Sequence, residues 1–304
     1  MKELDWEYID ALMPRRAAES SKNDYGRILC VCGSAGYTGA AFFAAQGAVR
    51  MGSGVVTLAV PERAWPVLAV KLSEPVVRPF PCTEDGLFSV RALPRLLGSG
   101  GRFGVNITYE VQEVARGIAD ALLIGCGLGR SDEVTEVVCT LLCEAACPIV
   151  LDADGIFALA QHKDILHRTA KPLVMTPHAG EFARLSGKKQ MQPEELRAFA
   201  QENRCTVLYK AHRTLIAAPD GRLFRNHTGN PGMAKGGSGD TLAGMLVSLI
   251  GQGLAPEDAA CAAAWLHGAA GDSAANRYGE YGMTPTDLLA CLPGVTRRYN
   301  TREW

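Results

Sequence analysis

The sequence predicts an α/β fold in which helices cover both faces of a mostly parallel sheet. Short runs rich in Val, Ile and Leu alternate with longer amphipathic segments, as is typical of strands buried on both faces. A glycine-rich or polar cluster follows nearly every short run. No linker or repeat interrupts the 304 residues. We therefore expect one domain, with an N-terminal extension at 1–14 and a C-terminal tail at 298–304.

The elements follow one another in β-α-β order, which favours parallel pairing. We expect strands at 28–32, 55–60, 121–124, 149–151, 173–175 and 206–209. Helical patterns lie at 40–51, 133–145, 193–202, 241–250 and 256–274. The turn signal Pro219-Asp220-Gly221 separates the short apolar runs 215–218 and 223–225, and this arrangement predicts a hairpin.

Composition narrows the class of protein. Apolar residues make up 47% of the chain and charged residues 21%, which is ordinary for a globular protein with a large core. The formal net charge is −1, so we expect no attraction to nucleic acid or to a membrane surface. The acidic start has no apolar signal region, and no apolar run reaches the length of a membrane span. We therefore expect a cytoplasmic protein.

The ten cysteines follow neither a disulfide nor a zinc pattern. Cys30 and Cys32 alternate within a predicted strand, where cysteine behaves as a small hydrophobic residue. Cys139, Cys143 and Cys147 recur every four residues, which predicts that they share one face of a helix. A zinc site would need a second ligand cluster, which the sequence lacks. We expect free, buried thiols in a reducing compartment.

Polar or glycine-rich clusters follow five of the predicted strands. They begin at Gly33, Gly125, Asp152, Thr176 and Lys210. The carboxyl ends of the strands of an open parallel sheet form its ligand crevice, so we expect the clusters to meet at one edge. Lys210 ends an apolar strand there, although a solvated surface lysine would fit the same position.

Most of these clusters have two interpretations. Residues 33–40 fit a plain strand-to-helix turn as well as a binding loop, and they do not form a dinucleotide fingerprint. Arg130, beside the second glycine cluster, favours an anionic ligand. Asp152 and Asp154 fit turn and cap positions as well as a role in holding magnesium through water. His178 is expected to contact a substrate or the shell of a metal.

The most informative segment is residues 229–240, Gly-Asn-Pro-Gly-Met-Ala-Lys-Gly-Gly-Ser-Gly-Asp, which lead into an apolar helix. Glycines let backbone N–H groups approach an anion, and the helix adds the positive end of its dipole. We expect an anion hole at Gly237, Ser238 and Gly239. Asp240 would be a general base for a hydroxyl that attacks a phosphoryl group. The alternative is that Asp240 only caps the helix, but the loop holds more glycines than a cap requires.

With these motifs the chain resembles the ADP/ATP-dependent NAD(P)H-hydrate dehydratases, which are members of the ribokinase-like superfamily. The resemblance runs from about Arg15 to Arg297 and includes Gly-Ser-x-x-Tyr-x-Gly-Ala at 33–40, Gly-x-Gly-Leu-Gly at 125–129 and Thr-Pro-His at 176–178. Gly-Asn-Pro-Gly-Met-Ala followed by Gly-Ser-Gly-Asp is specific for the family, whereas Gly-x-Gly-Asp alone indicates only the superfamily. The resemblance implies a three-layer α/β/α sandwich.

The resemblance also implies a repair enzyme. Such an enzyme uses ADP or ATP, with Mg²⁺, to phosphorylate the 6-hydroxy hydrate of NADH or NADPH, and loss of phosphate restores the ring. Asp240 would reach the reactive end of the hydrate, and Glu181 would hold the metal through water. The other implied contacts are Ala40, Gly129 and His178 for the hydrate, and Lys210, Ala211, His212, Arg213, Thr214 and Gly239 for the nucleotide. ADP as donor and a homotetramer are implied as well.

Two positions depart from the family pattern on the nucleotide side. Ala211-His212 follow Lys210 where relatives usually place glycine, and Lys235 stands where many carry a small or hydroxyl residue. Both leave the choice between ADP and ATP open. The main alternative is a small-molecule kinase, because the same anion hole serves ordinary phosphoryl transfer. A non-catalytic adenylate sensor is the second alternative, and the Asp240 carboxylate beside phosphate argues against it.

Overall fold

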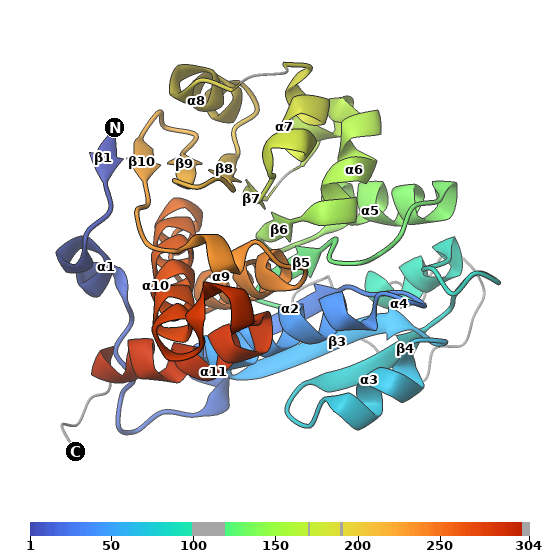
Figure 1. Ribbon diagram of the computed structural model, residues 1–304. Coiled ribbons are helices and arrows are strands. Elements are labelled where there is room, and N and C mark those ends of the chain that lie inside the picture. Colours follow the sequence, from blue (N-terminus) through green and yellow to red (C-terminus); the bar gives the residue numbers. More distant parts are fainter. Residues whose placement is uncertain (99–118, 170, 189–190, 300–304) are drawn as a thin grey trace.

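A ten-stranded sheet runs through the centre of the molecule (Figure 1). The computed structural model describes residues 1–98, 119–169, 171–188 and 191–299. The strand order is β1-β10-β9-β8-β7-β6-β5-β2-β3-β4, and all pairs from β8 to β4 are parallel. The strands are β1 Lys2–Glu3, β2 Arg27–Val31, β3 Val55–Pro61, β4 Val76–Phe80, β5 Ala121–Ile124, β6 Ile149–Leu151, β7 Leu173–Met175, β8 Thr206–Tyr209, β9 Leu215–Ala217 and β10 Leu223–Arg225.

The predicted strands and the hairpin β9–β10 are confirmed to within one residue at each end. Two edge strands were not predicted. β4 contains Arg78 and Pro79, which break its apolar run and which an edge strand tolerates. β1 has only two residues, both charged, and pairs in parallel with β10.

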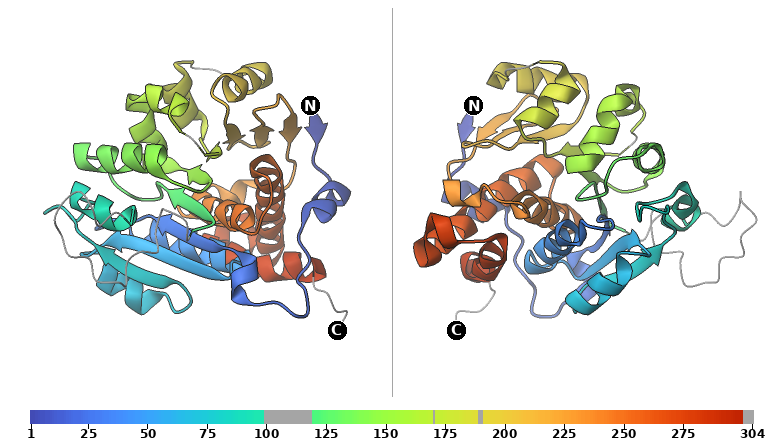
Figure 2. Two further views of the ribbon diagram at one scale, coloured as in Figure 1. Left: turned by 180° about the vertical axis from the view of Figure 1, so that it is seen from behind. Right: turned by 45° about the vertical axis from the view of Figure 1, so that its right-hand side comes forward.

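Helices cover both faces of the sheet, so the predicted three-layer sandwich is confirmed (Figures 1 and 2). One hydrophobic core joins the sheet to α1–α3 and α9–α11, and the other joins it to α4–α8. The helices are α1 Trp6–Leu12, α2 Thr38–Arg50, α3 Trp65–Lys71, α4 Leu93–Leu96, α5 Asp132–Glu144, α6 Ala153–Gln161, α7 Ala179–Ser186, α8 Pro193–Glu202, α9 Ser238–Gly251, α10 Pro256–Gly282 and α11 Pro285–Thr296.

Some predicted helix boundaries need correction. α5 ends at Glu144, so Cys139 and Cys143 lie on this helix and Cys147 lies beyond it. The three thiols therefore do not share one helix. All ten cysteines are free, but Cys139, Cys143 and Cys291 are only partly buried, against our expectation of buried thiols. α10 continues eight residues past the predicted end at Ala274, with a kink where Gly279 has φ 74° and ψ 154°.

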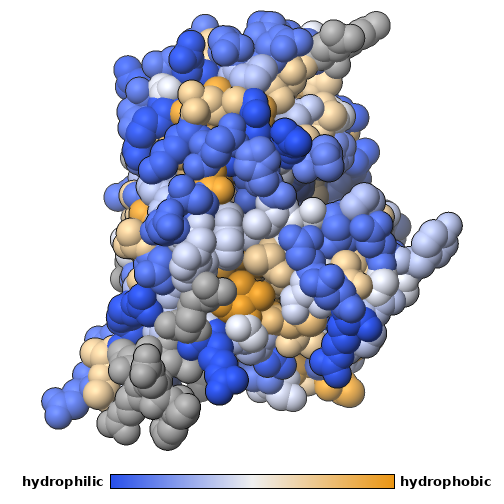
Figure 3. All heavy atoms as spheres, turned by 60° about the vertical axis from the view of Figure 1, so that its left-hand side comes forward, coloured by the Kyte–Doolittle hydropathy of each residue, from blue (hydrophilic) through white to orange (hydrophobic). Residues whose placement is uncertain are grey.

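The first residues of the chain join the fold, although we expected them to form an extension. β1 extends the sheet, and the Tyr8 hydroxyl of α1 donates a hydrogen bond to Asp258 of α10 over 3.1 Å. Of the expected C-terminal tail, residues 300–304 lie outside the described residues. No helix in the described part is both long and apolar enough to cross a bilayer. Hydrophilic side chains cover most of the face in Figure 3, with small apolar patches among them.

Glycines let α2 and α9 approach each other closely. A Cβ added at Gly244 would lie 2.0 Å from the carbonyl oxygen of Ala44, and one at Gly47 would lie 2.5 Å from that of Thr241. Both distances are too short for a carbon atom. The two glycines therefore fix how deeply the start of α9 sits against the sheet.

We expect Gly244→Ala to destabilise the protein by about 2 kcal/mol or more, because the new methyl group must push α2 and α9 apart. Gly294→Ala is the matched control, since Gly294 lies in α11 and a Cβ there meets nothing within 4 Å. Alanine there should be neutral or should add up to about 1 kcal/mol. Urea unfolding measures both variants, and equal stabilities would contradict the close contact.

Candidate active site

Loops from the carboxyl ends of five parallel strands meet the N-terminus of α9 at one edge of the sheet, as predicted. The loop after β2 is bound to the loop after β5, because Gly33 N–H donates to Cys126 O and Ser34 Oγ donates to Gly127 O, both over 2.8 Å. Gly125 has φ 132°, and a Cβ on it would lie 1.8 Å from the Asp152 carbonyl oxygen. Only glycine permits this approach.

Asp152, which follows β6, is the most heavily bonded carboxylate at this edge. Its Oδ1 accepts from Thr176 Oγ1 over 2.7 Å and from Lys210 Nζ over 2.6 Å. Asp152 stands at the N-cap of α6 but makes no capping hydrogen bond, and the following Ala153 has φ 48°, a strained value for a residue with a side chain. Asp152 therefore occupies the cap position, but its carboxylate binds Thr176 and Lys210 and not the helix N-terminus.

Lys210 lies at the end of β8 with its ammonium in the crevice rather than in solvent. Its side chain is 21% exposed and that of Asp152 is 2% exposed. Burial disfavours the charge, but the nearby carboxylates of Asp152 and Glu181 outweigh burial and raise the pKa of Lys210. Lys210 therefore remains charged, as a phosphate ligand requires.

Asp154 has a different role from Asp152. Its carboxylate accepts from Gly129 N–H over 3.0 Å and from Arg130 Nε over 3.1 Å, and the Arg130 guanidinium also lies 4.1 Å from the centre of the Phe157 ring. Arg130 thus uses its Nε to bind Asp154 and stacks on α6, while its side chain remains 58% exposed. Asp154 braces the loop that carries Gly129.

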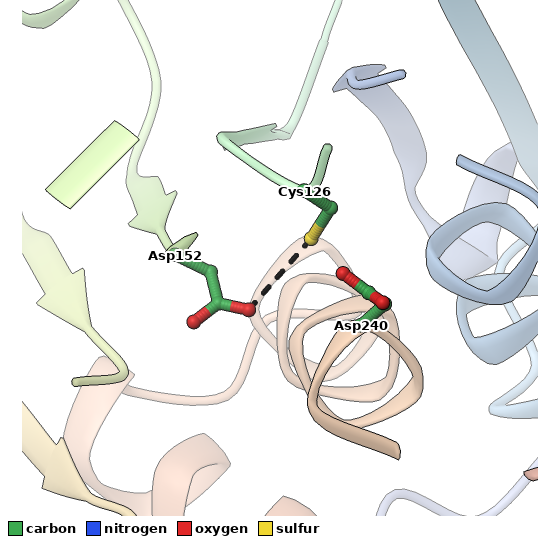
Figure 4. A group of neighbouring side chains, drawn as sticks. All are labelled: Cys126, Asp152 and Asp240. Carbon is green, nitrogen blue, oxygen red and sulfur yellow. Dashed lines mark hydrogen bonds between the residues drawn. The ribbon is translucent and has the colours of Figure 1, made fainter. Parts of the chain in front are cut away.

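Asp240 does not cap α9. The helix begins at Ser238, three residues earlier than expected, and its N-cap is Gly237 with φ 101°. Asp240 instead lies in the first turn, and its carboxylate faces Cys126 and Asp152 (Figure 4). One ligand atom from each of these three residues lies within 4.8 Å of the others. Burial, and next the charge of Asp152, raise the pKa of Asp240 to about 6, against smaller lowering effects of Cys126 and Lys210.

The expected anion hole is formed in part. The N–H of Ser238 donates to Lys235 O over 3.2 Å, so it is already committed. The N–H groups of Gly237 and Gly239 make no hydrogen bond to any described residue. A Cβ on Gly239 would lie 3.4 Å from Lys210 Nζ, so the two available N–H groups and the lysine can act on one anion.

A cavity of about 760 Å³ opens beside this anion hole, a volume typical of pockets for small ligands. It brings together most of the residues expected to bind the nucleotide, namely Lys210, Ala211, His212, Thr214 and Gly239, but its walls do not include Arg213. Lys235 also lines it, yet its ammonium donates to Tyr281 O over 2.8 Å and to Met283 O. Lys235 thus ties the glycine loop to the end of α10.

His178 and Glu181 form a reciprocal cap at the start of α7. His178 Nδ1 accepts from the N–H groups of Gly180 and Glu181 over 3.0 and 3.3 Å, and Glu181 Oε2 accepts from His178 N–H over 2.9 Å. An accepting Nδ1 leaves the proton of the neutral ring on Nε2. The His178 side chain is 59% exposed and lines the cavity, and its Nε2 lies 3.4 Å from Glu181 Oε1.

Ala40 and Gly129 lie outside the walls of the cavity. A Cβ on Gly127 would lie 2.7 Å from Ala40 Cβ, and one on Gly129 would lie 2.6 Å from a methyl group of Leu87. The loops after β2 and β5 therefore form a second surface next to Cys126. The Asp240 carboxylate faces Cys126 in the loop after β5, and its neighbour Gly239 lines the cavity.

Sequence reasoning missed residues that α10 contributes. Asp272 accepts from Gly229 N–H and Asn230 Nδ2, both over 2.9 Å, and so orders the glycine loop. His267 Nε2 lies 3.5 Å from Ser238 Oγ, and burial lowers the pKa of His267 to about 4. Both lie in or next to an apolar run that gave no functional signal.

The carboxylates of Asp152 and Asp240 could hold a magnesium ion, whereas Glu181 lies outside that group and its two oxygens contact His178 at 2.9 and 3.4 Å. Mg²⁺ prefers oxygen ligands and keeps several of its waters, so the two aspartates fit it directly or through water. The Cys126 thiol does not suit so hard an ion. The carboxylates are therefore suitable ligands for magnesium, and the thiol is not.

We expect Asp240→Asn to be more stable than the parent protein at high pH. The pKa of Asp240 is raised from 3.8 to about 6, so its ionisation costs stability as pH rises through this interval, by up to about 3 kcal/mol. The amide cannot ionise. Urea unfolding at about pH 5 and about pH 8 should show a gap that widens with pH. Asp132→Asn is the control, since Asp132 is exposed in the first turn of α5, and a constant gap for Asp240→Asn would contradict the shift.

The sequence model of the NAD(P)H-hydrate dehydratase family matches residues 28–294. The bifunctional NAD(P)H-hydrate repair enzyme Nnr of Moorella thermoacetica is 43% identical over 94% of this chain and 52% of its own length. The chain thus spans about half the length of the bifunctional relatives it matches. The ADP-dependent (S)-NAD(P)H-hydrate dehydratase of Bacillus subtilis is 32% identical over 96% of this chain and 97% of its own.

Solved structures agree with the sequence matches. The ADP/ATP-dependent NAD(P)H-hydrate dehydratase of B. subtilis, co-crystallised with ATP and Mg²⁺, has a TM-score of 0.76 at 31% identity and covers 96% of each chain. A ribokinase-like superfamily protein of Enterococcus faecalis has a TM-score of 0.81 at 25% identity over 99% of this chain and 97% of its own. The predicted resemblance is confirmed, and the chain belongs to the NAD(P)H-hydrate dehydratase family.

Proposed function

We propose that this chain is an ADP-dependent dehydratase of the (S)-hydrates of NADH and NADPH. The observation that carries the proposal is the position of Asp240. It follows Gly239, which lines the cavity, and its carboxylate faces Cys126, whose neighbour Gly127 packs against Ala40. A carboxylate there can reach a hydroxyl group from one side while a phosphoryl group approaches from the other. The family membership supports the choice of substrate.

Asp240 would act as the general base of the first step. It takes the proton of the ring hydroxyl, whose oxygen forms a bond to the terminal phosphorus of ADP, while the bond to the bridging oxygen breaks and AMP leaves. A carboxylate with a pKa of about 6 is ionised at neutral pH and is a stronger base than an ordinary aspartate. Lys210 and the N–H groups of Gly237 and Gly239 would stabilise the phosphoryl oxygens.

The second step needs little from the protein. The ring nitrogen donates its electron pair, the carbon–oxygen bond to phosphate breaks, and a proton leaves the neighbouring ring carbon, so the ring double bond is restored. Phosphate is a far better leaving group than hydroxide. The family resemblance supports Ala40, Gly129 and His178 as contacts of the hydrate, and Lys210–Thr214 and Gly239 as contacts of the nucleotide.

The proposal also includes a magnesium ion, a homotetrameric assembly and a cytoplasmic location. Mg²⁺ would neutralise charge on the phosphoryl groups, and Glu181 would hold it through water. The ATP and Mg²⁺ named for the B. subtilis crystals support this ion. The family resemblance supports a homotetramer, and ten free cysteines favour a reducing compartment such as the cytoplasm.

We expect the protein to regenerate NADH from its enzymatically prepared hydrate only when a nucleotide is present. The absorbance of the reduced nicotinamide is followed with Mg²⁺ and with ADP, ATP or neither, and the faster reaction identifies the donor. No recovery with either donor, in folded protein that binds ADP, would overturn the dehydratase. Formation of a stable phosphate ester from a small alcohol would then favour the kinase.

We expect Asp240→Asn to bind ADP normally but to lose at least about a hundredfold in turnover, the scale of a lost general base. Asp132→Asn, in the first turn of α5, is the matched control and should keep full activity. Steady-state rates and calorimetric ADP binding separate the two effects. Near-normal turnover in Asp240→Asn would remove this residue from the mechanism.

A further inference from the structure

Three donor atoms lie close together in the crevice. The proposed reaction does not use these three atoms as a group. They are the Cys126 thiol from the loop after β5, the Asp152 carboxylate after β6 and the Asp240 carboxylate from α9 (Figure 4). One ligand atom of each lies within 4.8 Å of the others. A sulfur and two oxygens at these separations can bind one metal ion with little movement.

The two oxygens of Asp152 are in different environments. Oδ1 is bound by Thr176 and Lys210, whereas Oδ2 has only the Cys126 thiol as a partner among the described residues, at 3.8 Å. A thiol is a weak donor. Asp152 is 1% exposed, so a buried carboxylate oxygen points at the sulfur without a strong hydrogen bond. This oxygen is under-coordinated, and a cation would satisfy it.

The charges also favour a cation. Asp152 and Asp240 bring two carboxylates to the site, and Lys210 is the ammonium paired with one of them. A divalent cation would offset the repulsion between the two carboxylates, and it would displace the thiol proton when it binds the sulfur.

We propose that Cys126, Asp152 and Asp240 form a binding site for a thiophilic divalent cation of the zinc class. The cation forms a bond to Cys126 Sγ as the thiol proton leaves to solvent, and it takes one oxygen from each carboxylate. Water or a phosphate oxygen completes a tetrahedral shell. The sulfur selects Zn²⁺ or Cd²⁺ over Mg²⁺, which is a harder ion.

Binding of this cation has a functional consequence that rests on the proposed function. A carboxylate that coordinates the cation no longer accepts a proton, so the bound ion removes Asp240 as a base. Zinc would then inhibit the enzyme in the presence of excess magnesium.

Cadmium titration of the full chain tests the site without any activity measurement. After treatment with a chelator, the protein is titrated with Cd²⁺ in excess Mg²⁺ while the ultraviolet charge-transfer band of the cadmium–thiolate bond is recorded. We expect one tight equivalent. Cys126→Ser should lose the band of that equivalent and weaken binding at least about tenfold.

The control addresses the other thiols. Cys139 and Cys143 are partly exposed and one turn apart on α5, and could bind Cd²⁺ themselves. The variant with both changed to serine should keep the tight equivalent. Asp240→Asn, which keeps the sulfur, should retain the band but bind Cd²⁺ more weakly. This variant tests the site if Cys126→Ser does not fold. An unchanged band in Cys126→Ser, or its loss in the α5 variant, would overturn the site.

Activity then separates the two proposals. Each variant is compared with its own metal-free rate in excess Mg²⁺. We expect Zn²⁺ to inhibit the parent protein, and Cys126→Ser to need at least about tenfold more Zn²⁺ for the same inhibition. Stoichiometric binding at Cys126 without inhibition would support the metal site and contradict Asp240 as the base.

Discussion

The ion pair between Asp152 and Lys210 is the interaction on which the crevice depends. It joins the loop after β6 to the end of β8 over 2.6 Å, and Thr176 after β7 completes it. Removal of one partner would leave the other charge buried, which costs about 3–5 kcal/mol in comparable cases. The same pair contributes to the electrostatics, because burial and next the charge of Asp152 raise the pKa of Asp240, while Lys210 lowers it.

The position of Asp240 depends on packing far from any ligand. α9 can bring its first turn to the sheet edge because Gly47 and Gly244 let it lie directly against α2. The glycine loop leads into α9, and Asp272 of α10 holds the start of this loop through hydrogen bonds from Gly229 and Asn230. Helix packing and loop ordering therefore act together to position the carboxylate, and none of Gly47, Gly244 and Asp272 lines the cavity.

The sequence predicted the parts of the fold that repeat a strong pattern. The buried parallel strands are continuous apolar runs, so periodicity located them, whereas β4 is interrupted by Arg78 and Pro79. α6 and α7 were missed because each is short and begins inside a polar cluster, at Ala153 and Ala179. Asp240 was predicted from its place after the glycines. Cys126 was not, since one residue between glycines carries no signal until the Asp152 and Asp240 loops close around it.

The features that suit the site to proton transfer also lower the stability of the fold. They also allow a cation other than magnesium to bind there. Asp240 is a better base because burial and the charge of Asp152 disfavour its ionised form, and the same repulsion lowers the stability of the fold above the pKa of this group. Lys210 cannot relieve it fully, because its ammonium is bound to Oδ1 of Asp152 and leaves Oδ2 facing Cys126. A lysine centred between the two carboxylates would relieve the repulsion, but it would lower the pKa of the base. The geometry therefore keeps two carboxylates that repel each other. The sulfur beside them determines which cations can bind there and reduce that repulsion.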